Sequence, residues 1–219
     1  MKRPYITLKF AQTLDGRIAA RDGSSKWISG PGSLKLTHKL RARNDAILIG
    51  VGTVLQDNPS LTVRLAKGKN PTRIIIDPKL RTPYTSRVIK NTKIAKTIIV
   101  TARKAPKVKV AQFRQKGVEF VFLPLSKRGY IDLEKIISIL YKKGIKSMLV
   151  EGGGRIITSF MKKGLVDKLI AIISPKILGK GKDAVGDLGI GNIKWALKLR
   201  IKSAKHLGKD IVYTAFLDK

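Results

Sequence analysis

The sequence has 219 residues, 43% of them hydrophobic, and its 46 Lys and Arg against 14 Asp and Glu give a net charge of +32. This length suits one domain of moderate size or two small ones, and the apolar fraction is sufficient for a packed core. The absence of Cys excludes disulfides and thiolate metal sites, and no apolar run is long enough for a transmembrane helix.

The positive charge raises two function classes, which are nucleic-acid binding and the handling of anionic, phosphorylated small molecules. A surface for single-stranded nucleic acid needs basic residues interleaved with aromatic ones. Here the basic residues are spread along the whole chain, and aromatic residues make up only 6%. We therefore expect no specific nucleic-acid partner and no membrane partner. Because residues 1–5 lack the apolar segment of a secretory signal, we also expect a cytoplasmic location.

The first predicted elements are a strand and two turns. Residues 5–11 are rich in β formers and predict the strand. Asp15-Gly16 is a turn signal within the segment that follows. Residues 21–27 are polar with one Trp and are interpreted as a loop.

Residues 29–43 are predicted to form the first helix. Ser29 or Gly30 can cap it, and Pro31 suits its first turn. Its inner side carries Leu36 and Leu40. Its outer side is predicted to be basic, with Lys35, Lys39, Arg41 and Arg43.

Continuous apolar runs predict buried, parallel strands in the middle of the chain. These runs cover residues 46–49, 73–78, 97–101, 118–123, 149–150 and 168–173. Residues 50–55, at the carboxyl end of the first of these strands, are interpreted as a turn, and 56–64 as a turn with an extended piece. In open α/β sheets, ligands sit at that end of the strands.

The sequence predicts a helix that begins near Asp132 and a hairpin at the end of the chain. Asp132 is expected to cap the helix, which Gly144 ends and whose inner face carries Leu133, Ile136, Ile137 and Leu140. Residues 179–191 are glycine-rich and are interpreted as a mobile loop. The segments 197–204 and 210–217 alternate apolar and polar residues, which predicts an antiparallel hairpin turning through His206, Leu207 and Gly208.

These elements predict a single α/β domain over residues 1–219. It should have a mostly parallel central sheet flanked by helices, with the antiparallel hairpin at its C-terminal end. We find no internal repeat and no change in composition that would mark a domain boundary.

The run Gly152-Gly153-Gly154 is predicted to be a turn between a strand and a helix, with Glu151 at its mouth. Glycines let the backbone take φ > 0 and let a ligand approach the main chain. The helix that follows points free N–H groups and its positive dipole end at the turn, which suits a phosphate such as a dinucleotide pyrophosphate. A tight connection without a ligand explains this stretch, taken alone, equally well.

Four motifs occur together and in order, namely T-L-D-G at 13–16, G-T-V-L-Q-D-N-P-S-L-T-V-R at 52–64, E-G-G-G at 151–154 and S-P-K-I-L-G at 174–179. With these motifs the sequence resembles, from Pro4 to Leu217, the riboflavin-biosynthesis pyrimidine reductase family. That family comprises the reductase part of bacterial RibD and its stand-alone archaeal and fungal relatives. The resemblance implies a dihydrofolate-reductase-like fold, NADPH (NADP) as cofactor and a homodimer.

The resemblance also implies an activity, which is reduction of the ribosyl group of a pyrimidine 5′-phosphate to a ribityl group. The bifunctional bacterial relatives add an N-terminal zinc deaminase domain. Because the sequence has no Cys and no H-x-E signature, we expect that domain to be absent. Stand-alone reductases of this family generally act before deamination, so the resemblance implies that the substrate is 2,5-diamino-6-ribosylamino-4(3H)-pyrimidinone 5′-phosphate, with its deaminated uracil counterpart as the alternative. A dihydrofolate reductase is a further rival, which the segments 25–27 and 61–64 disfavour.

The resemblance assigns cofactor contacts to several segments. Gly152, Gly153 and Gly154 would cradle the pyrophosphate, and Ala11 with Lys9 would line the nicotinamide side. Thr53 and Asp57 match NADP-contacting positions, although both residue types also cap turns well. The adenosine end and its 2′-phosphate are assigned to Pro78, Lys79, Leu80, Arg81, Thr101 and Arg103, with ordinary surface charge as the alternative for the two arginines.

The substrate contacts implied by the resemblance are Ser25, Trp27, Arg41, Leu61, Arg64 and Glu151. Arg41 and Arg64 would hold the 5′-phosphate through charge-assisted hydrogen bonds. An ionised Glu151 accepts hydrogen bonds and so suits the amino groups of the pyrimidine; its alternative role is to orient the glycine turn. The catalytic candidates are Lys9, Asp57 and Glu151, with water as an alternative proton donor. Asp15, His38 and His206 are interpreted as structural, and no metal site is expected.

Overall fold

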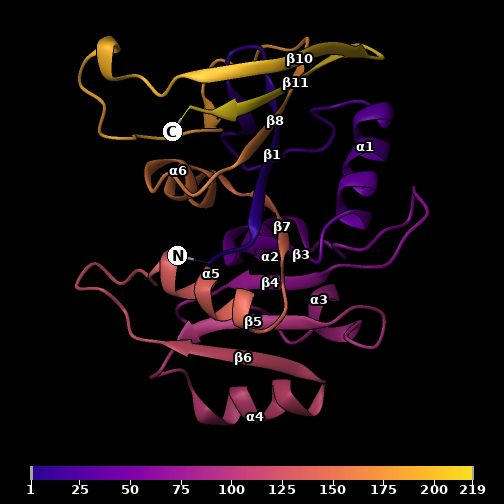
Figure 1. The fold of residues 1–219 in the computed structure, drawn as a ribbon. Helices are drawn as coiled ribbons and strands as arrows, with labels where there is room; N and C mark the ends of the chain where they lie inside the picture. The colour runs from indigo at the N-terminus through magenta and orange to yellow at the C-terminus, as the bar shows by residue number, and fades with distance from the viewer. Residues whose placement is uncertain (1, 219) are drawn as a thin grey trace. The chain divides into compact units, whose positions relative to one another are not determined.

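The computed structural model describes residues 2–218, which form two compact units (Figure 1). Unit 1 comprises residues 2–4 and 38–148, and unit 2 comprises residues 5–37 and 149–218. The chain passes between the units within two regular elements, α1 (Pro31–Ala42) and β7 (Ser147–Gly152). The single domain expected over 1–219 stays a prediction.

Unit 1 is built on four parallel strands in the order β3-β4-β5-β6. All six residues of β5 are buried. A parallel strand covered on both faces reads as a continuous apolar run, so these strands were predictable from sequence. The strands are β3 (Ala46–Gly50), β4 (Thr72–Ile76), β5 (Thr97–Ala102) and β6 (Val118–Leu123).

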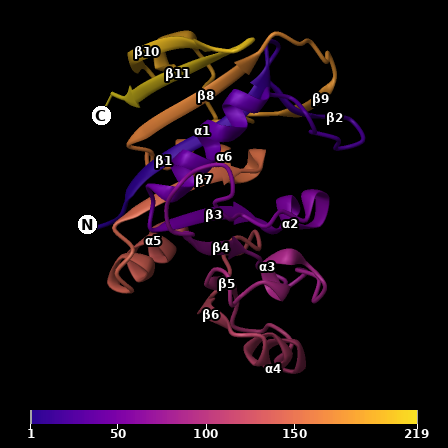
Figure 2. The same ribbon diagram turned by 90° about the vertical axis from the view of Figure 1, so that its right-hand side faces the viewer.

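Helices cover both faces of these strands. On one face, α2, α3 and α4 contribute Val54, Val88 and Phe113 to a core shared with the strand residues Ile75 and Ile99. On the other face lies α5, which Figure 2 shows on the opposite side of the strands. The helices are α2 (Val51–Asp57), α3 (Arg87–Lys90), α4 (Lys107–Gln115) and α5 (Leu133–Lys142).

The cap predicted for α5 is confirmed. The carboxylate of Asp132 accepts hydrogen bonds from the backbone N–H of Glu134 at 2.9 Å and of Lys135 at 3.3 Å. The predicted inner face is also confirmed, because Leu133, Ile136, Ile137 and Leu140 are the buried residues of this helix.

Three helices of unit 1 were not predicted from the sequence. The turn expected over 50–55 is wrong, because α2 begins at Val51; it is short and buries only Val51 and Val54, too few for a visible period. Neither α3 nor α4 was predicted. The sequence of α4 begins Lys-Val-Lys-Val, which alternates like a strand, and its buried residues are Val110 and Phe113.

Helix α1 lies within the predicted range 29–43, but its outer side is not uniformly basic. Arg41 is only 8% exposed, so its expected place on the basic outer side is wrong. The N-terminal end of α1 is held from β11 (Asp210–Leu217). The carboxylate of Asp210 accepts from Gly30 N at 2.8 Å and from Ser33 Oγ at 2.5 Å.

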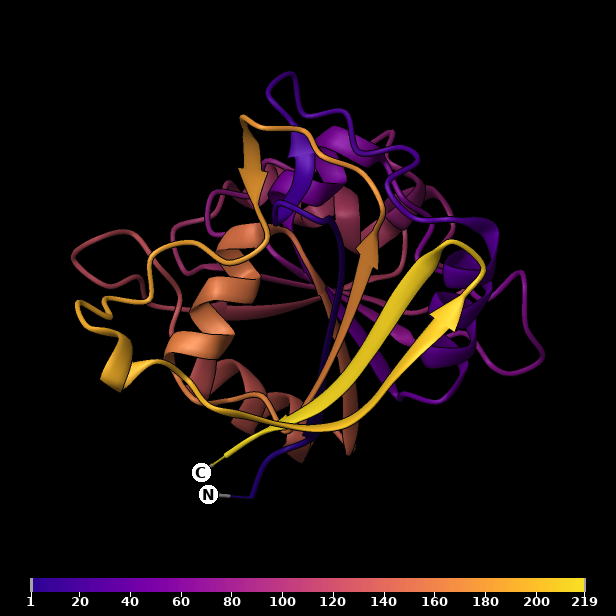
Figure 3. The same cartoon turned by 90° about the horizontal axis from the view of Figure 1, so that it is seen from above.

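Unit 2 is built on β1 (Tyr5–Thr13), which pairs in parallel with β8 (Lys168–Ser174). β11 pairs antiparallel with β8, and β10 (Leu199–Leu207) pairs antiparallel with β11. Figure 3 shows α6 (Gly154–Lys162) and the start of α1 on opposite sides of these strands. The α/β class with mostly parallel strands and a C-terminal antiparallel hairpin is therefore confirmed.

Two details of unit 2 differ from prediction. The hairpin turns at Gly208-Lys209 and not through His206, because His206 and Leu207 still pair with Ile211 and Asp210. The glycine-rich segment 179–191 is not wholly a loop. It contains β9 (Gly181–Asp183), which pairs with the unpredicted β2 (Arg17–Ala20), and it is followed by the short helix η1 (Ile193–Trp195).

None of the helices within residues 2–218 has the length and apolar character needed to cross a lipid bilayer.

Arg73, on β4, is a fully buried cation in unit 1. Its guanidinium donates to the carbonyls of Ser60 at 3.3 Å, Asn91 at 3.0 Å and Ala95. Burial lowers the pKa of Arg73 to about 10, so the side chain stays charged at neutral pH. One side chain thereby ties the segment before Leu61 and the end of α3 to the central strands.

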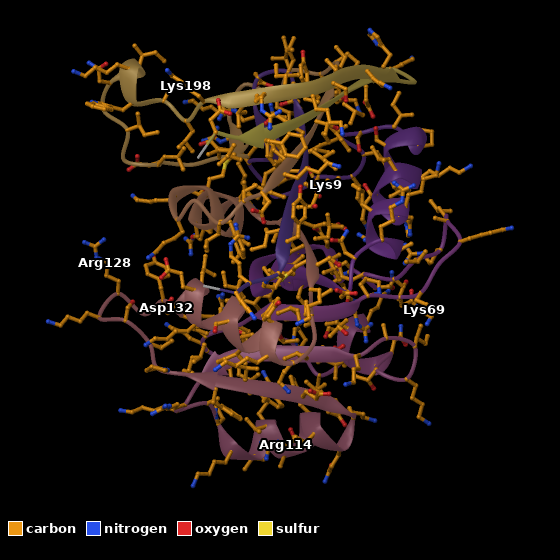
Figure 4. The ribbon with its side chains drawn as sticks, in the orientation of Figure 1. Lys9, Lys69, Arg114, Arg128, Asp132 and Lys198 are labelled. Carbon is orange, nitrogen blue, oxygen red and sulfur yellow. The ribbon has the colours of Figure 1, made fainter. Side chains whose placement is uncertain are left out.

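We predict that Arg73→Met lowers the free energy of unfolding by about 3 kcal/mol, because three carbonyls lose their charged donor. Urea unfolding measures this change. Arg128→Met is the matched control, since Arg128 projects from a loop of unit 1 (Figure 4) and its replacement should cost less than about 0.5 kcal/mol. Equal costs for the two variants would show that the buried contacts of Arg73 contribute little.

Candidate functional site

In unit 1, two candidate arginines meet at one residue, Thr62. The Arg41 Nη1 atom donates to the Thr62 carbonyl at 3.3 Å, and the Arg64 Nη1 atom donates to the Thr62 hydroxyl at 3.1 Å. Arg41 lies on α1, whereas Thr62 and Arg64 follow α2, so the cluster joins segments about 20 residues apart. The structure thus brings together the two side chains that were expected to hold a phosphate.

The segment that carries Thr62 and Arg64 has an unusual backbone path. Leu61 lies in the left-handed region with φ +55° and is only 2% exposed. A left-handed leucine is costly, so the surrounding structure must hold it in place. Leu61 therefore anchors the segment in the core of unit 1, while Arg64 at its end is exposed.

A second group of candidates lies at the end of α2. Thr53 and Asp57 are half-buried, in the first and last turns of this helix. Asn58 ends the helix in the left-handed region, and its side chain accepts from Arg87 N at 2.8 Å. Asn58 is thus the C-cap of α2 through its backbone N–H, which donates to the Val54 carbonyl, while its side chain receives the first N–H of α3.

The turn after β4 is fixed by a buried acid. One carboxylate oxygen of Asp77 accepts from the Thr82 backbone N–H and from its hydroxyl, both at 2.7 Å. This closes the loop that carries the cofactor candidates Pro78, Lys79, Leu80 and Arg81.

Within that loop the candidates have different environments. Lys79 and Arg81 are exposed, whereas Leu80 is 2% exposed with φ +49°. Thr101 is buried, and its hydroxyl donates to the Pro78 carbonyl at 3.4 Å, so it supports the turn from β5. Arg103 follows β5 and is exposed. The exposed cations of this group are those that a phosphate in solution could reach.

In unit 2, the three glycines at the start of α6 have different local conformations and surroundings. Gly152 has φ +111°, which favours glycine, and it is joined to Gly153 by a cis peptide bond. At Gly154 a Cβ atom would lie 2.7 Å from the carbonyl oxygen of Asp183, so the close approach of the protein's own backbone explains this glycine. Gly153 has φ −69°, which any residue can adopt.

Gly153 is also the N-cap of α6 and, because it has no side chain, it makes no side-chain capping hydrogen bond of its own. An anion placed at this turn would be stabilised by the dipole and by the N–H groups of the first turn.

Asp15 joins two of the sequence motifs. Its carboxylate accepts from the Thr13 hydroxyl at 2.6 Å, from Gly179 N at 2.7 Å and from Leu178 N at 3.2 Å. The Thr13 hydroxyl, aided by these backbone donors, holds the pKa of Asp15 below its ordinary value. The T-L-D-G and S-P-K-I-L-G motifs are thus one structural feature, and the structural reading of Asp15 is confirmed.

The remaining unit 2 candidates lie on β1, on β7 and in the 21–27 loop. Lys9, labelled in Figure 4, and Ala11 are half-buried on β1, paired with Ile170 and Ile172 of β8. Two residues apart, they point to the same face of the strand. Glu151 is half-buried near the end of β7 and Ser25 is half-buried in the loop.

Trp27 is 70% exposed, so its ring does not anchor the loop within unit 2. The loop is held through its backbone instead, because Lys176 Nζ donates to the Trp27 carbonyl at 2.5 Å. The ring is therefore available to contact a ligand or a partner.

Over residues 2–218, no three His, Cys, Asp or Glu side chains gather as a metal site would require. Three basic side chains of unit 1 illustrate how its exposed positive charge is distributed. Lys69, Arg114 and Arg128 project from it in different directions (Figure 4).

Sequence reasoning missed Thr62 and the backbone role of His38. His38 was interpreted as structural without a partner, yet its Nδ1 atom accepts from Arg64 N at 2.9 Å. These residues are 26 positions apart, and nothing local in the sequence signals such a contact. The signal that was available is the position of His38 three residues before Arg41, on the same face of α1.

Residues 4–213 match the family model described as the RibD C-terminal domain. The chain is similar to the riboflavin biosynthesis protein RibD of Aquifex aeolicus, with 44% identity, and this match covers 96% of the chain but 57% of that protein's length. It is also similar to a 2,5-diamino-6-ribosylamino-4(3H)-pyrimidinone 5′-phosphate reductase of Methanothermobacter thermautotrophicus, with 38% identity and 96% of each chain covered.

Solved structures give the same picture. A diaminohydroxyphosphoribosylaminopyrimidine deaminase/5-amino-6-(5-phosphoribosylamino)uracil reductase from Thermotoga maritima superimposes with a TM-score of 0.81 at 33% identity, covering 99% of this chain and 57% of that one. Dihydrofolate reductase from Enterococcus faecalis, at 13% identity, matches with a TM-score of 0.54 over 98% of this chain and 97% of its own. The dihydrofolate-reductase-like fold is therefore confirmed.

We predict that Asp15→Asn destabilises the protein near neutral pH and that this difference shrinks on acidification. The lowered pKa means that the ionised carboxylate stabilises the folded state above its unfolded-state pKa. That contribution is lost as the pH falls through the folded-state pKa. Urea unfolding midpoints of both proteins across the acidic range measure the effect. A difference that does not change with pH would mean that the charge of Asp15 is irrelevant.

Proposed function

Because the chain belongs to the RibD C-terminal domain family, we propose that it is an NADPH-dependent reductase of riboflavin biosynthesis. Its substrate in this proposal is 2,5-diamino-6-ribosylamino-4(3H)-pyrimidinone 5′-phosphate, whose ribosyl side chain it reduces to the ribityl form. This activity is the one named for the archaeal relative that the chain matches over 96% of both lengths.

The observation that carries the proposal is the arginine pair at Thr62. Arg41 is fixed and nearly buried, whereas Arg64 is exposed, and both donate to the same residue. Guanidinium groups bind phosphate oxygens in pairs through charge-assisted hydrogen bonds. We assign the substrate's 5′-phosphate to Arg41 and Arg64, with Leu61 and Ser25 as further substrate contacts.

The glycine turn of unit 2 fits the pyrophosphate of NADPH. Gly152 takes a backbone shape that favours glycine, and Gly153 begins α6 without a side-chain cap. An anion therefore meets the N–H groups and the positive dipole end of the helix directly. Gly154 plays a different part, because it gives room to the backbone of Asp183. The other cofactor contacts assigned are Ala11, Thr53, Asp57, Pro78, Lys79, Leu80, Arg81, Thr101 and Arg103.

The chemistry requires the ribosylamino ring to open to an imine between C1′ and the exocyclic nitrogen. NADPH, when bound, supplies a hydride that adds to C1′, and the nitrogen takes up a proton. The protein must hold the two reactants in register, which is the larger part of such catalysis.

The protein side of the reaction rests on few side chains. Glu151 is assigned to the amino groups of the pyrimidine, because an ionised carboxylate only accepts hydrogen bonds. Lys9 and Asp57 are the candidate proton donors, with water as the alternative. Trp27, whose ring is 70% exposed, is assigned a contact with the substrate.

We include a homodimer and a cytoplasmic location in this proposal. Exposed apolar side chains support the homodimer, since Ile193 and Trp195 of η1 and Ile201 of β10 are 89%, 68% and 60% exposed. Large apolar side chains that are exposed to this degree are candidates for contact with another protein chain.

The decisive experiment is to follow NADPH oxidation with the diamino ribosylaminopyrimidine phosphate and, in parallel, with its deaminated counterpart. We expect faster turnover of the diamino compound. A preference for the deaminated compound would support the reductase activity and contradict the proposed substrate. Absence of oxidation with either compound, together with absence of NADPH binding, would overturn the proposal.

A glycine variant tests the cofactor assignment. We predict that Gly153→Ala weakens NADPH binding at least about tenfold while the fold persists, because its φ of −69° accepts a side chain and the added methyl group would occupy the anion's place. NADPH fluorescence measures binding, and circular dichroism checks the fold. Gly191→Ala is the matched control, since a Cβ there meets no atom within 4 Å. Equal affinity in both variants would mean that the turn is only a connection.

A further inference from the structure

The segment Ser60–Arg64 belongs to no helix or strand, so its peptide groups need partners outside a regular ladder. Side chains supply these partners. Arg73 donates to the Ser60 carbonyl at 3.3 Å and Arg41 to the Thr62 carbonyl at 3.3 Å, while Asn70 Oδ1 accepts from Val63 N at 2.7 Å and His38 Nδ1 accepts from Arg64 N at 2.9 Å. The path of the segment is therefore set by side chains from other elements.

His38 makes the contact that lies at Arg64 itself. It is only 1% exposed. The Arg64 backbone N–H is a donor, so the Nδ1 atom that receives it carries a lone pair, and the ring proton lies on Nε2. A ring turned by half a revolution would present a carbon to this N–H, which makes the nitrogen assignment chemically necessary.

Arg64 is an exposed residue that is nevertheless held at both ends. The Arg64 backbone N–H donates to His38 Nδ1, and the Arg64 guanidinium donates to the Thr62 hydroxyl at 3.1 Å. A long cationic side chain loses much rotamer freedom when it binds an anion. Holding the main chain and the guanidinium before binding reduces that loss.

One turn of α1 controls both arginines of the pair. Arg41 follows His38 by three residues, so the two side chains lie on one face of the helix. Arg41 reaches Thr62 directly, and His38 reaches Arg64. Two of the contacts that hold the Thr62–Arg64 segment thus come from one helix.

We propose that His38 is a positioning residue for substrate binding. Its neutral imidazole fixes the main chain at Arg64, so that the Arg64 guanidinium is presented beside that of Arg41 for the 5′-phosphate. This inference rests on the proposed function for the identity of the anion. The hydrogen bond from Arg64 to His38 is itself independent of that function.

Two variants distinguish the hydrogen-bond acceptor role of His38 from a role in which its ring only fills space in the core. His38→Asn places an amide oxygen near the position of Nδ1 and keeps the acceptor. His38→Leu has comparable bulk and lacks the acceptor. Arg64→Ala provides the reference for complete loss of the guanidinium.

The test combines amide hydrogen exchange at Arg64 with kinetics. In His38→Leu, we expect exchange of the Arg64 amide to be about tenfold faster and KM for the diamino substrate to rise about tenfold, since a lost buried hydrogen bond has this size. The kcat value and the Kd for NADPH should change less than about threefold. His38→Asn should restore both exchange and KM toward the wild-type values.

Three results would overturn the proposal. The first is unchanged exchange at Arg64 in His38→Leu. The second is a KM in His38→Asn as high as in His38→Leu, which would mean that the effect comes from shape. The third is a parallel rise of KM and of the Kd for NADPH, which would indicate general loosening. If the wild type turns over neither substrate, the proposed function fails, and the exchange data alone decide whether His38 holds Arg64.

Discussion

The structure depends on one constraint, which is that peptide groups outside helices and strands must still find hydrogen-bond partners. Several connecting segments of this chain are irregular, and buried or half-buried side chains supply partners for their peptide groups. Asp15 receives the N–H of Gly179, the Asp77 carboxylate receives that of Thr82, and Arg73 donates to the carbonyl of Ser60. The Asp77 and Arg73 contacts restrain the backbone of the loops that carry the exposed candidates Arg81 and Arg64.

The net charge of +32 is less informative than these few contacts. Most of the basic side chains are exposed, and Lys69, Arg114 and Arg128 point in separate directions. Basic side chains that are buried or hydrogen-bonded to the fold are better indicators of a binding site than the net charge is. Arg73 is fully buried and donates to backbone carbonyls, whereas Arg41 is nearly buried and donates to Thr62, which Arg64 also contacts. Restraint by neighbours, and not the number of charges, distinguishes a binding cation from a solvated one.

Sequence patterns predicted the strands of unit 1 and the cap of α5, because a run buried on both faces and an Asp N-cap are local signals. They failed at α4, whose Lys-Val-Lys-Val start alternates like a strand while its packing requires only Val110 and Phe113. For the candidate site, the resemblance supplied Arg41 and Arg64. Their meeting at Thr62 could not be predicted, since it depends on how α1 packs on a segment distant in sequence.

The pairing of β1 with β8 has a consequence for the order of events during synthesis. Thr7 lies opposite Lys168 in that pair, so strand β1 leaves the ribosome long before its partner exists. The 38–148 part of unit 1, by contrast, is contiguous and has its four parallel strands complete by Leu123. Chains that grow from the N-terminus fold what is available first. All four parallel strands of unit 1 are therefore synthesised before β8, the partner of β1, is available for pairing.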